Sequence, residues 1–300
     1  MTSVAVTRIV ALLVAALALV VTPVSAEPAR NPLLHAERVL LVDAEGRTIY
    51  AKDADHEHAP ASLVKLMTLY LAFEDLESAR ATLEDVVTIT RAVAHTPRYR
   101  MGLREGEEVP LRTLLEGVAI ASANDAAAAV AEHLGGNEET FVARMNAKAA
   151  ALGLTGTRFA NPHGLPDPVQ RSTARDLALL TTRLLHDYPL VRTMLGGQTF
   201  IYRGRVYARR IPLFNDPGGV QALKTGFTRE AGYNLSVSAW RDGQQFVMII
   251  LGAPTRALSY LDAKRLLHFG FVETGLELVV EPARPPAKKP VRARKNGSRS

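Results

Sequence analysis

The chain has 300 residues, of which 47% are hydrophobic and 22% charged, a size and balance typical of a globular protein with one large domain or two small ones. It contains no cysteine, which excludes disulfide bonds, thiolate metal sites and a cysteine nucleophile. The formal net charge of +6 arises at the C-terminal end, where residues 283–300 carry seven cationic side chains and no acidic one. Residues 27–282 have a slight excess of acidic side chains, so the body of the chain is not expected to bind nucleic acid.

The first 26 residues are typical of a secretory signal peptide. Arg8 precedes an unbroken apolar run over residues 9–21, and Val24 and Ala26 occupy the two positions that signal peptidase reads. The run is shorter than the roughly 20 apolar residues that a membrane-spanning helix needs. We therefore expect cleavage after Ala26 and export from the cytoplasm, with an uncleaved N-terminal anchor as the alternative.

Strand-forming segments at the two ends of the body enclose a helical block. Arg38–Asp43 and Thr48–Lys52 are rich in strand-forming residues and are separated by a short turn. Apolar periodicity then predicts helices over residues 63–74, 111–121, 125–134, 138–152 and 173–186. An Asp-Gly turn joins the expected strands 233–240 and 245–252, and a last helix is expected over residues 256–268. This order predicts an α+β fold, with one antiparallel sheet from both chain ends, an inserted helical lobe and a cleft between them.

Residues 276–300 are expected to form a disordered basic tail after a folded domain over residues 27–275. The tail is rich in Pro, Lys, Arg and Ser, a composition that does not form a packed core. Its positive charge would attract anionic polymers or lipid headgroups. A solvated tail without a specific role is the alternative.

The first motif with chemical meaning is Ser62-Leu63-Val64-Lys65, at the start of the first expected helix. Lys65 follows Ser62 by one helical turn, so its amine can reach the serine hydroxyl. Apolar neighbours should leave Lys65 poorly solvated, which lowers a lysine pKa and yields a neutral amine that can take the serine proton. Backbone N–H groups at the helix start can stabilise an oxyanion. A capping serine with a snorkelling lysine is the alternative, since such a pattern occurs about once in 300 residues by chance.

A second motif, Ser122-Ala123-Asn124, interrupts two expected helices. A loop at this point can aim both polar side chains into a cleft. Ser122 can then relay a proton to a leaving amine, and Asn124 can hold the lysine and a substrate amide. A pair of helix caps is the alternative, because Ser and Asn favour such positions.

The third motif, Lys224-Thr225-Gly226, is expected on an edge strand that faces the cleft. Successive side chains of a strand point to opposite faces, and a lysine charge with a threonine hydroxyl suits the binding of a substrate carboxylate. Gly226 lets the substrate backbone come close, and the Phe227 N–H can complete an oxyanion hole with that of Ser62. An ordinary strand with an exposed lysine is the alternative, although a fixed tripeptide is expected only about 0.1 times in 300 residues by chance.

The three motifs occur in an order that resembles the penicillin-recognising serine enzymes, with their S-x-x-K, S-x-N and K-T-G signatures. Five stretches that include them resemble the D-alanyl-D-alanine carboxypeptidase family of low-molecular-mass penicillin-binding proteins: residues 39–68, 114–136, 141–168, 172–180 and 222–235. The resemblance implies the β-lactamase/DD-peptidase-like fold, peptidoglycan stem peptides as substrate, β-lactam antibiotics as inhibitors, and no metal or cofactor. Such a protein is expected in the periplasm or the cell wall, where the basic tail would meet anionic wall polymer or a membrane surface.

The resemblance also implies a catalytic role for four residues. Ser62 would attack the carbonyl of the penultimate D-alanine, with Lys65 as general base, while Ser122 and Asn124 help proton transfer and hold the substrate. D-alanine would then leave, and water would hydrolyse the acyl-enzyme. Penicillins would acylate Ser62 and deacylate slowly.

Substrate binding is assigned by the same resemblance to the strand motif. Lys224 and Thr225 would bind the terminal carboxylate beside Gly226. The backbone N–H groups of Ser62 and Phe227 would form the oxyanion hole.

Three other functions compete with this interpretation. A class A β-lactamase needs a glutamate that activates the deacylating water, and residues 159–176 contain none. A D,D-endopeptidase would cut peptidoglycan crosslinks with the same chemistry and a larger leaving group. A silent wall-binding protein would keep the fold without activity, which the presence of every motif residue disfavours.

His56, Glu57 and His58 are the one cluster that invites a metal site. Their spacing is not that of a helical zinc-binding pair. We therefore expect them to lie in a solvated loop.

Overall fold

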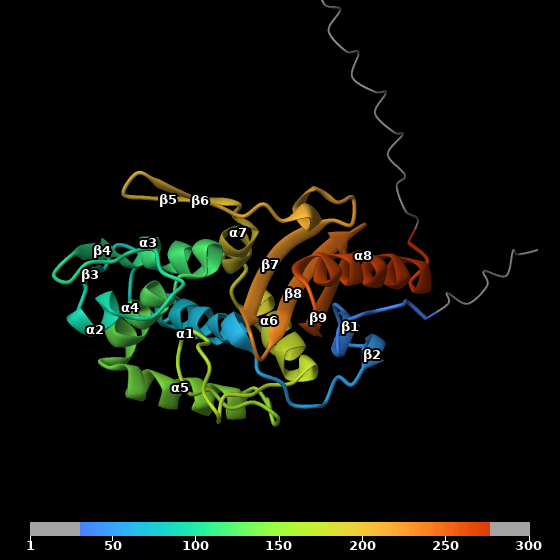
Figure 1. Ribbon diagram of the computed structural model, residues 1–300, viewed down its shortest axis with the longest axis horizontal. Helices are drawn as coiled ribbons and strands as arrows, with labels where there is room; N and C mark the ends of the chain where they lie inside the picture. The colour runs from blue at the N-terminus through green and yellow to red at the C-terminus, as the bar shows by residue number, and fades with distance from the viewer. Residues whose placement is uncertain (1–30, 277–300) are drawn as a thin grey trace, which may run out of the picture.

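A computed structural model describes residues 31–276 (Figure 1). Its central element is a five-stranded antiparallel sheet with the strand order β2-β1-β9-β8-β7. The strands come from both ends of the domain: β1 (Arg38–Asp43), β2 (Thr48–Lys52), β7 (Val220–Thr228), β8 (Gly232–Arg241) and β9 (Gln244–Ala253). β1 pairs with β9 along its whole length, which joins the two ends of the domain and confirms the predicted α+β fold.

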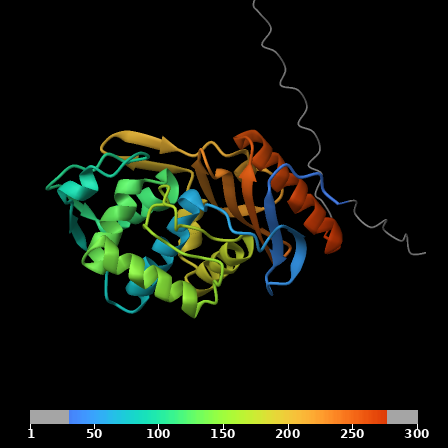
Figure 2. The ribbon, with the colours of Figure 1, turned by 60° about the horizontal axis from the view of Figure 1, so that its bottom comes forward.

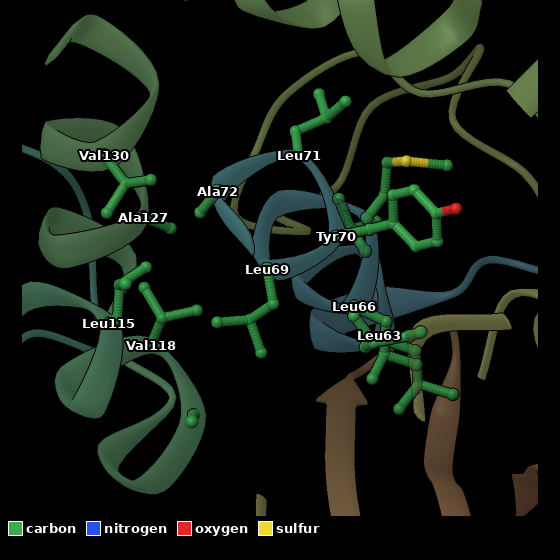
Figure 3. Close-up of a cluster of buried hydrophobic side chains, with 14 of the residues drawn as sticks. Leu63, Leu66, Leu69, Tyr70, Leu71, Ala72, Leu115, Val118, Ala127 and Val130 are labelled. Atoms are coloured by element: carbon green, nitrogen blue, oxygen red, sulfur yellow. The ribbon is translucent and has the colours of Figure 1, made fainter. Parts of the chain in front are cut away.

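A helical lobe lies between β2 and β7 in the sequence. It comprises η1 (Ala61–Val64), α1 (Lys65–Glu77), α2 (Arg91–Ala94), α3 (Leu111–Glu116), η2 (Gly117–Ala121), α4 (Asn124–Gly135), α5 (Glu138–Ala151), α6 (Ala174–Asp187) and α7 (Val191–Gly196). α1 is at the centre of the lobe, where Leu69 and Ala72 point toward Leu115, Val118 and Val130 (Figure 3). Each buried leucine stabilises the lobe by about 1.5–3 kcal/mol. The N-terminus of α1 is therefore held on a rigid support.

Each face of the sheet packs against a different set of helices. On β9, Ile249 and Leu251 belong to a core shared with the helical lobe, whereas Met248 and Ile250 belong to a second core beneath α8 (Arg256–Glu273). This alternation follows from the two-residue repeat of a strand. Figures 1 and 2 show α8 on the side of the sheet away from the lobe. The edge strand β7 contacts η1, so the border between sheet and lobe runs along β7.

Several elements differ from the prediction. Two small antiparallel strand pairs were not predicted: β3 (Val86–Thr88) with β4 (Glu108–Pro110), between which α2 lies in the sequence, and the hairpin of β5 (Thr199–Tyr202) with β6 (Arg205–Ala208). β3 and β4 have only three residues each, and in the β5–β6 pair the buried Phe200 and the exposed Ile201 and Val206 are all apolar. Neither pair therefore shows a clear apolar alternation in the sequence. The prediction also missed the short helices α2, α7 and η3 (Pro212–Asn215), the last of which precedes β7. α8 continues beyond the predicted end at residue 268, because Gly270 stays helical and packs closely against Leu41.

The predicted signal peptide, residues 1–26, lies outside the described residues, as does the basic tail beyond residue 276. The domain limits at residues 27 and 275 therefore remain predictions. Within residues 31–276, no helix is both long and apolar enough to cross a membrane.

Candidate active site

Ser62 and Lys65 lie on consecutive turns where the 3-10 helix η1 passes into α1. The Lys65 Nζ is 3.1 Å from the Ser62 Oγ, as the three-residue spacing predicts. The Lys65 side chain has no exposed surface, whereas Ser62 lines an open pocket. The predicted pairing of a reachable hydroxyl with a desolvated amine is therefore present.

The remaining partners of Lys65 are uncharged oxygen atoms. Its Nζ donates to the Asn124 Oδ1 at 2.7 Å and to the His163 carbonyl oxygen. Burial lowers the pKa of Lys65 to about 7, against the opposing effect of the Asp125 carboxylate. The His163 ring stays neutral, because burial and the nearby Lys65 lower its pKa to about 3. A lysine without a contacting carboxylate can lose its proton near neutral pH, which a general base requires.

Ser122 and Asn124 owe their positions to a break in the helix. The π-helical turn η2 ends at Ser122, whose backbone is left-handed with φ 54°, and α4 begins at Asn124. The Asn124 Nδ2 donates to the carbonyls of Arg98 at 2.8 Å and Pro97 at 3.2 Å. These two bonds orient the amide so that its oxygen faces Lys65. The predicted break between the helices is confirmed, and both the oxygen and the nitrogen of the Asn124 side-chain amide form hydrogen bonds.

Lys224 is a buried residue of β7 that faces the lobe. Its Nζ donates to the Ser122 Oγ at 2.7 Å and to the Thr225 carbonyl oxygen at 3.0 Å. Burial, with the nearby positive charges of Lys65 and Arg209, lowers the pKa of Lys224 well below its usual value. The Ser62–Lys65 pair and the Ser122–Lys224 pair thus meet at one pocket. Thr225 lies half-buried in the wall of that pocket.

Gly226 allows β7 to approach the nucleophile. A Cβ atom at this position would lie 3.1 Å from the Ser62 amide nitrogen and 3.2 Å from the Pro60 carbonyl oxygen. Any side chain would therefore push the strand away from η1. The next residue, Phe227, is partly exposed, and its ring centroid is 4.4 Å from that of Tyr233.

The pocket between lobe and sheet has a volume of about 490 Å³, enough for a short peptide. Six predicted site residues line it: Ser62, Ser122, Lys224, Thr225, Gly226 and Phe227. Lys65 and Asn124 lie buried behind Ser62. The structure thus brings all eight predicted residues to one place.

Arg209 is a pocket residue that the sequence analysis missed. Its Nη1 donates to the carbonyls of Leu195 at 3.0 Å and Gly197 at 3.1 Å, and its Nη2 to that of Leu223 at 2.6 Å. Burial lowers its pKa to about 10, which still leaves a cation at neutral pH. It follows an exposed hairpin in the sequence, where no local pattern distinguishes it from its neighbour Arg210.

Asp125 and Tyr99 are two further residues that were missed. The buried Asp125 carboxylate accepts the backbone N–H groups of Met101 at 2.9 Å, Gly102 at 2.9 Å and Leu103 at 3.1 Å. These bonds fix the loop that carries Tyr99, whose exposed side chain lines the pocket. The sequence carried one indication of this role. Asp125 lies in the alanine-rich start of α4, where a carboxylate would be buried and would need hydrogen-bond donors.

The prediction of a solvated loop is wrong for His58. Its Nε2 lies 2.9 Å from the Ala231 carbonyl oxygen, and its backbone forms an antiparallel bridge with Ser172. The Asn234 Nδ2 donates to the Ala59 carbonyl oxygen at 3.0 Å. These contacts anchor the segment before Ser62, whereas His56 and Glu57 are exposed as expected.

A hydroxyl beside a buried lysine, with a second serine–lysine pair across the pocket, is the arrangement of a serine acyl-transfer enzyme. Residues 25–255 match the family model described as D-alanyl-D-alanine carboxypeptidase. The chain therefore belongs to this family, which confirms the resemblance seen in the sequence.

Curated relatives in this family align with this chain over different shares of their own length. DacC of Escherichia coli K12 is 37% identical over 248 residues, which are 80% of this chain and 62% of that protein. DacF of Bacillus subtilis is 34% identical, over 79% of this chain and 62% of its own length. The chain thus spans less than two thirds of these curated relatives. A D-alanyl-D-alanine endopeptidase of Pseudomonas aeruginosa is 32% identical over 93% of this chain and 92% of that protein.

Solved structures agree with the fold. Penicillin binding protein 5 from Haemophilus influenzae superimposes with a TM-score of 0.79 and 33% identity, over 81% of this chain and 72% of that one. Penicillin-binding protein D2 from Listeria monocytogenes, in its ampicillin-bound form, gives 0.74 and 29%, over 81% of this chain and 100% of that one. These similarities confirm the predicted fold class.

Proposed function

We propose that the chain is a serine-type D-alanyl-D-alanine carboxypeptidase that trims peptidoglycan stem peptides and is acylated by penicillins. The observation that carries the proposal is the buried Lys65 amine, 3.1 Å from the Ser62 hydroxyl and with a pKa lowered to about 7. Membership of the family and the named relatives support the substrate class. No metal or cofactor has a role in this chemistry.

In the acylation step, the Ser62 Oγ bonds to the carbonyl carbon of the penultimate D-alanine while its proton passes to the Lys65 Nζ. The carbonyl oxygen becomes an oxyanion, which the N–H groups of Ser62 and Phe227 stabilise. The close approach of Gly226 to Ser62 supports this pairing of donors. Asn124 holds Lys65 in position through its Oδ1.

In the next step, the bond to the leaving amine breaks and the Ser122 Oγ gives its proton to that amine. Lys224, which contacts the Ser122 Oγ at 2.7 Å, supports this transfer and with Thr225 binds the terminal carboxylate. D-alanine departs, and the proton that Lys65 took from Ser62 passes to the Ser122 Oγ, which leaves Lys65 neutral again. Water then attacks the ester on Ser62 while Lys65 accepts a proton from it, and this proton returns to the Ser62 Oγ as the ester bond breaks. With a penicillin, the leaving nitrogen remains tethered to the acyl group and obstructs the water.

We also propose that the protein is exported, to the periplasm or the cell wall where peptidoglycan lies. The apolar N-terminal segment supports export by a signal peptide cleaved after Ala26. The cationic residues beyond 283 support a weak contact of the tail with anionic wall polymer or membrane surface.

Release of free D-alanine from a peptide ending in D-Ala-D-Ala tests the proposal. The wild-type protein should release it and the Ser62→Ala variant should not. A folded wild-type protein that releases none would overturn the carboxypeptidase assignment.

D,D-endopeptidase action is the second candidate, and the match to the P. aeruginosa endopeptidase over 92% of its length favours it. The same residues would act, with a peptide amine in place of D-alanine as leaving group. Crosslinked stem-peptide dimers tested beside the monomeric peptide would separate the two activities by chromatography.

A further inference from the structure

The pocket is lined by more positively charged side chains than the binding of one carboxylate requires. Its lining includes four cationic residues, Arg209, Arg210, Lys224 and Arg256, and no acidic residue. A water-filled pocket with one sign of charge concentrates ligands of the opposite sign. The D-alanine that is removed carries a single carboxylate.

Two of these cations are already engaged within the protein. Lys224 donates to the Ser122 Oγ and to the Thr225 carbonyl, and Arg209 donates to three carbonyl groups. Both are therefore held in the wall of the pocket, where Lys224 and Thr225 serve the terminal carboxylate.

The other two cations are exposed and lack an anionic partner. Within residues 31–276, neither Arg210 nor Arg256 has an ion pair or a side-chain hydrogen bond. The Arg256 guanidinium lies 6.0 Å from the centroid of the Tyr233 ring. A guanidinium beside an aromatic ring keeps its edge N–H groups available for a carboxylate. Arg256 also begins α8, where the helix dipole favours an anion.

We propose that Arg210 and Arg256 bind a second carboxylate, on a part of the peptide that is not the terminal D-alanine. The enzyme would then select stem peptides with a free side-chain carboxylate over those in which that group is amidated. This inference rests on the proposed function and deepens it, because it defines the chemical class of the preferred substrate.

The test compares two peptides ending in D-Ala-D-Ala that differ only in a glutamate or a glutamine before that dipeptide. The wild-type kcat/KM for D-alanine release should be roughly five- to tenfold higher for the glutamate peptide, as a partly exposed charged hydrogen bond permits. In Arg256→Gln and Arg210→Gln, the ratio of the two kcat/KM values should fall toward one. The control Arg91→Gln removes an exposed arginine that does not line the pocket and should keep the wild-type ratio.

Equal rates for the two peptides in the wild-type protein would overturn the inference, as would an unchanged ratio in both arginine variants. If neither peptide releases D-alanine, the proposed function fails instead. The inference is then decided by the dissociation constants of the same peptides with the Ser62→Ala variant. There, five- to tenfold tighter binding of the glutamate peptide supports it, and equal binding overturns it.

Discussion

The lowered pKa of Lys65 makes the acylation of Ser62 depend on pH in a definite way. Burial is the main cause of the shift to about 7, and only the neutral amine can take the serine proton. With a pKa of about 7, the neutral fraction is about 10% at pH 6, about 50% at pH 7 and about 90% at pH 8. The acylation rate constant should therefore rise about ninefold from pH 6 to pH 8 and then level off.

The assay is single-turnover labelling with a fluorescent penicillin between pH 5 and pH 9.5 at constant ionic strength. Two variants test the assignment. Asn124→Asp places a carboxylate beside the Lys65 Nζ, so the midpoint should move about 1–3 pH units upward. Lys65→Arg keeps a permanent cation and should acylate at least about 100-fold more slowly. A flat profile, or a midpoint that does not respond to Asn124→Asp, would refute Lys65 as the base.

Three further predictions concern the supports of the site. Gly226→Ala should slow penicillin acylation by roughly 100-fold, because the new Cβ would crowd the Ser62 amide; an unaltered rate constant would contradict the role of close approach. Asp125→Ala should lower the free energy of unfolding in urea by about 3 kcal/mol or more, since three buried N–H groups lose their acceptor, while the exposed control Glu105→Ala should change it by less than about 0.5 kcal/mol. Leu69→Ala should lower the free energy of unfolding by about 2–5 kcal/mol in the same assay. If it lowers this free energy no more than Leu33→Ala does at an exposed position, α1 is not the centre of the lobe.

The parts of the fold that the sequence predicted are those with strong local signals. The β8–β9 hairpin follows from Asp242-Gly243, whose positive φ angles of 48° and 80° match the turn that joins such strands. Asn137 and Thr173 cap their helices through the amides of Thr140 and Asp176, as the residue types indicate. The β5–β6 hairpin gave no such signal, because its exposed face also carries apolar side chains, Ile201 and Val206, so its sequence does not alternate between apolar and polar residues.

The catalytic residues were predictable because each motif carries its own chemistry at a fixed spacing. The left-handed backbone of Ser122 and the π-helical turn before it were not, since they are imposed by the lobe around them. Arg209 was missed for a similar reason: its position depends on carbonyls of Leu195, Gly197 and Leu223, which adjoin it only in the folded chain. His58 was misread because its partner Ala231 is distant in sequence.

If Ser62 is the nucleophile, a penicillin will form a covalent adduct on its side chain, and this adduct can be detected directly. The purified protein is mixed with a penicillin at pH 8, digested and mapped by mass spectrometry. We expect one adduct per chain, on the peptide that contains Ser62, and none in the Ser62→Ala variant. An adduct on another residue, or a folded wild-type protein that forms none, would contradict it.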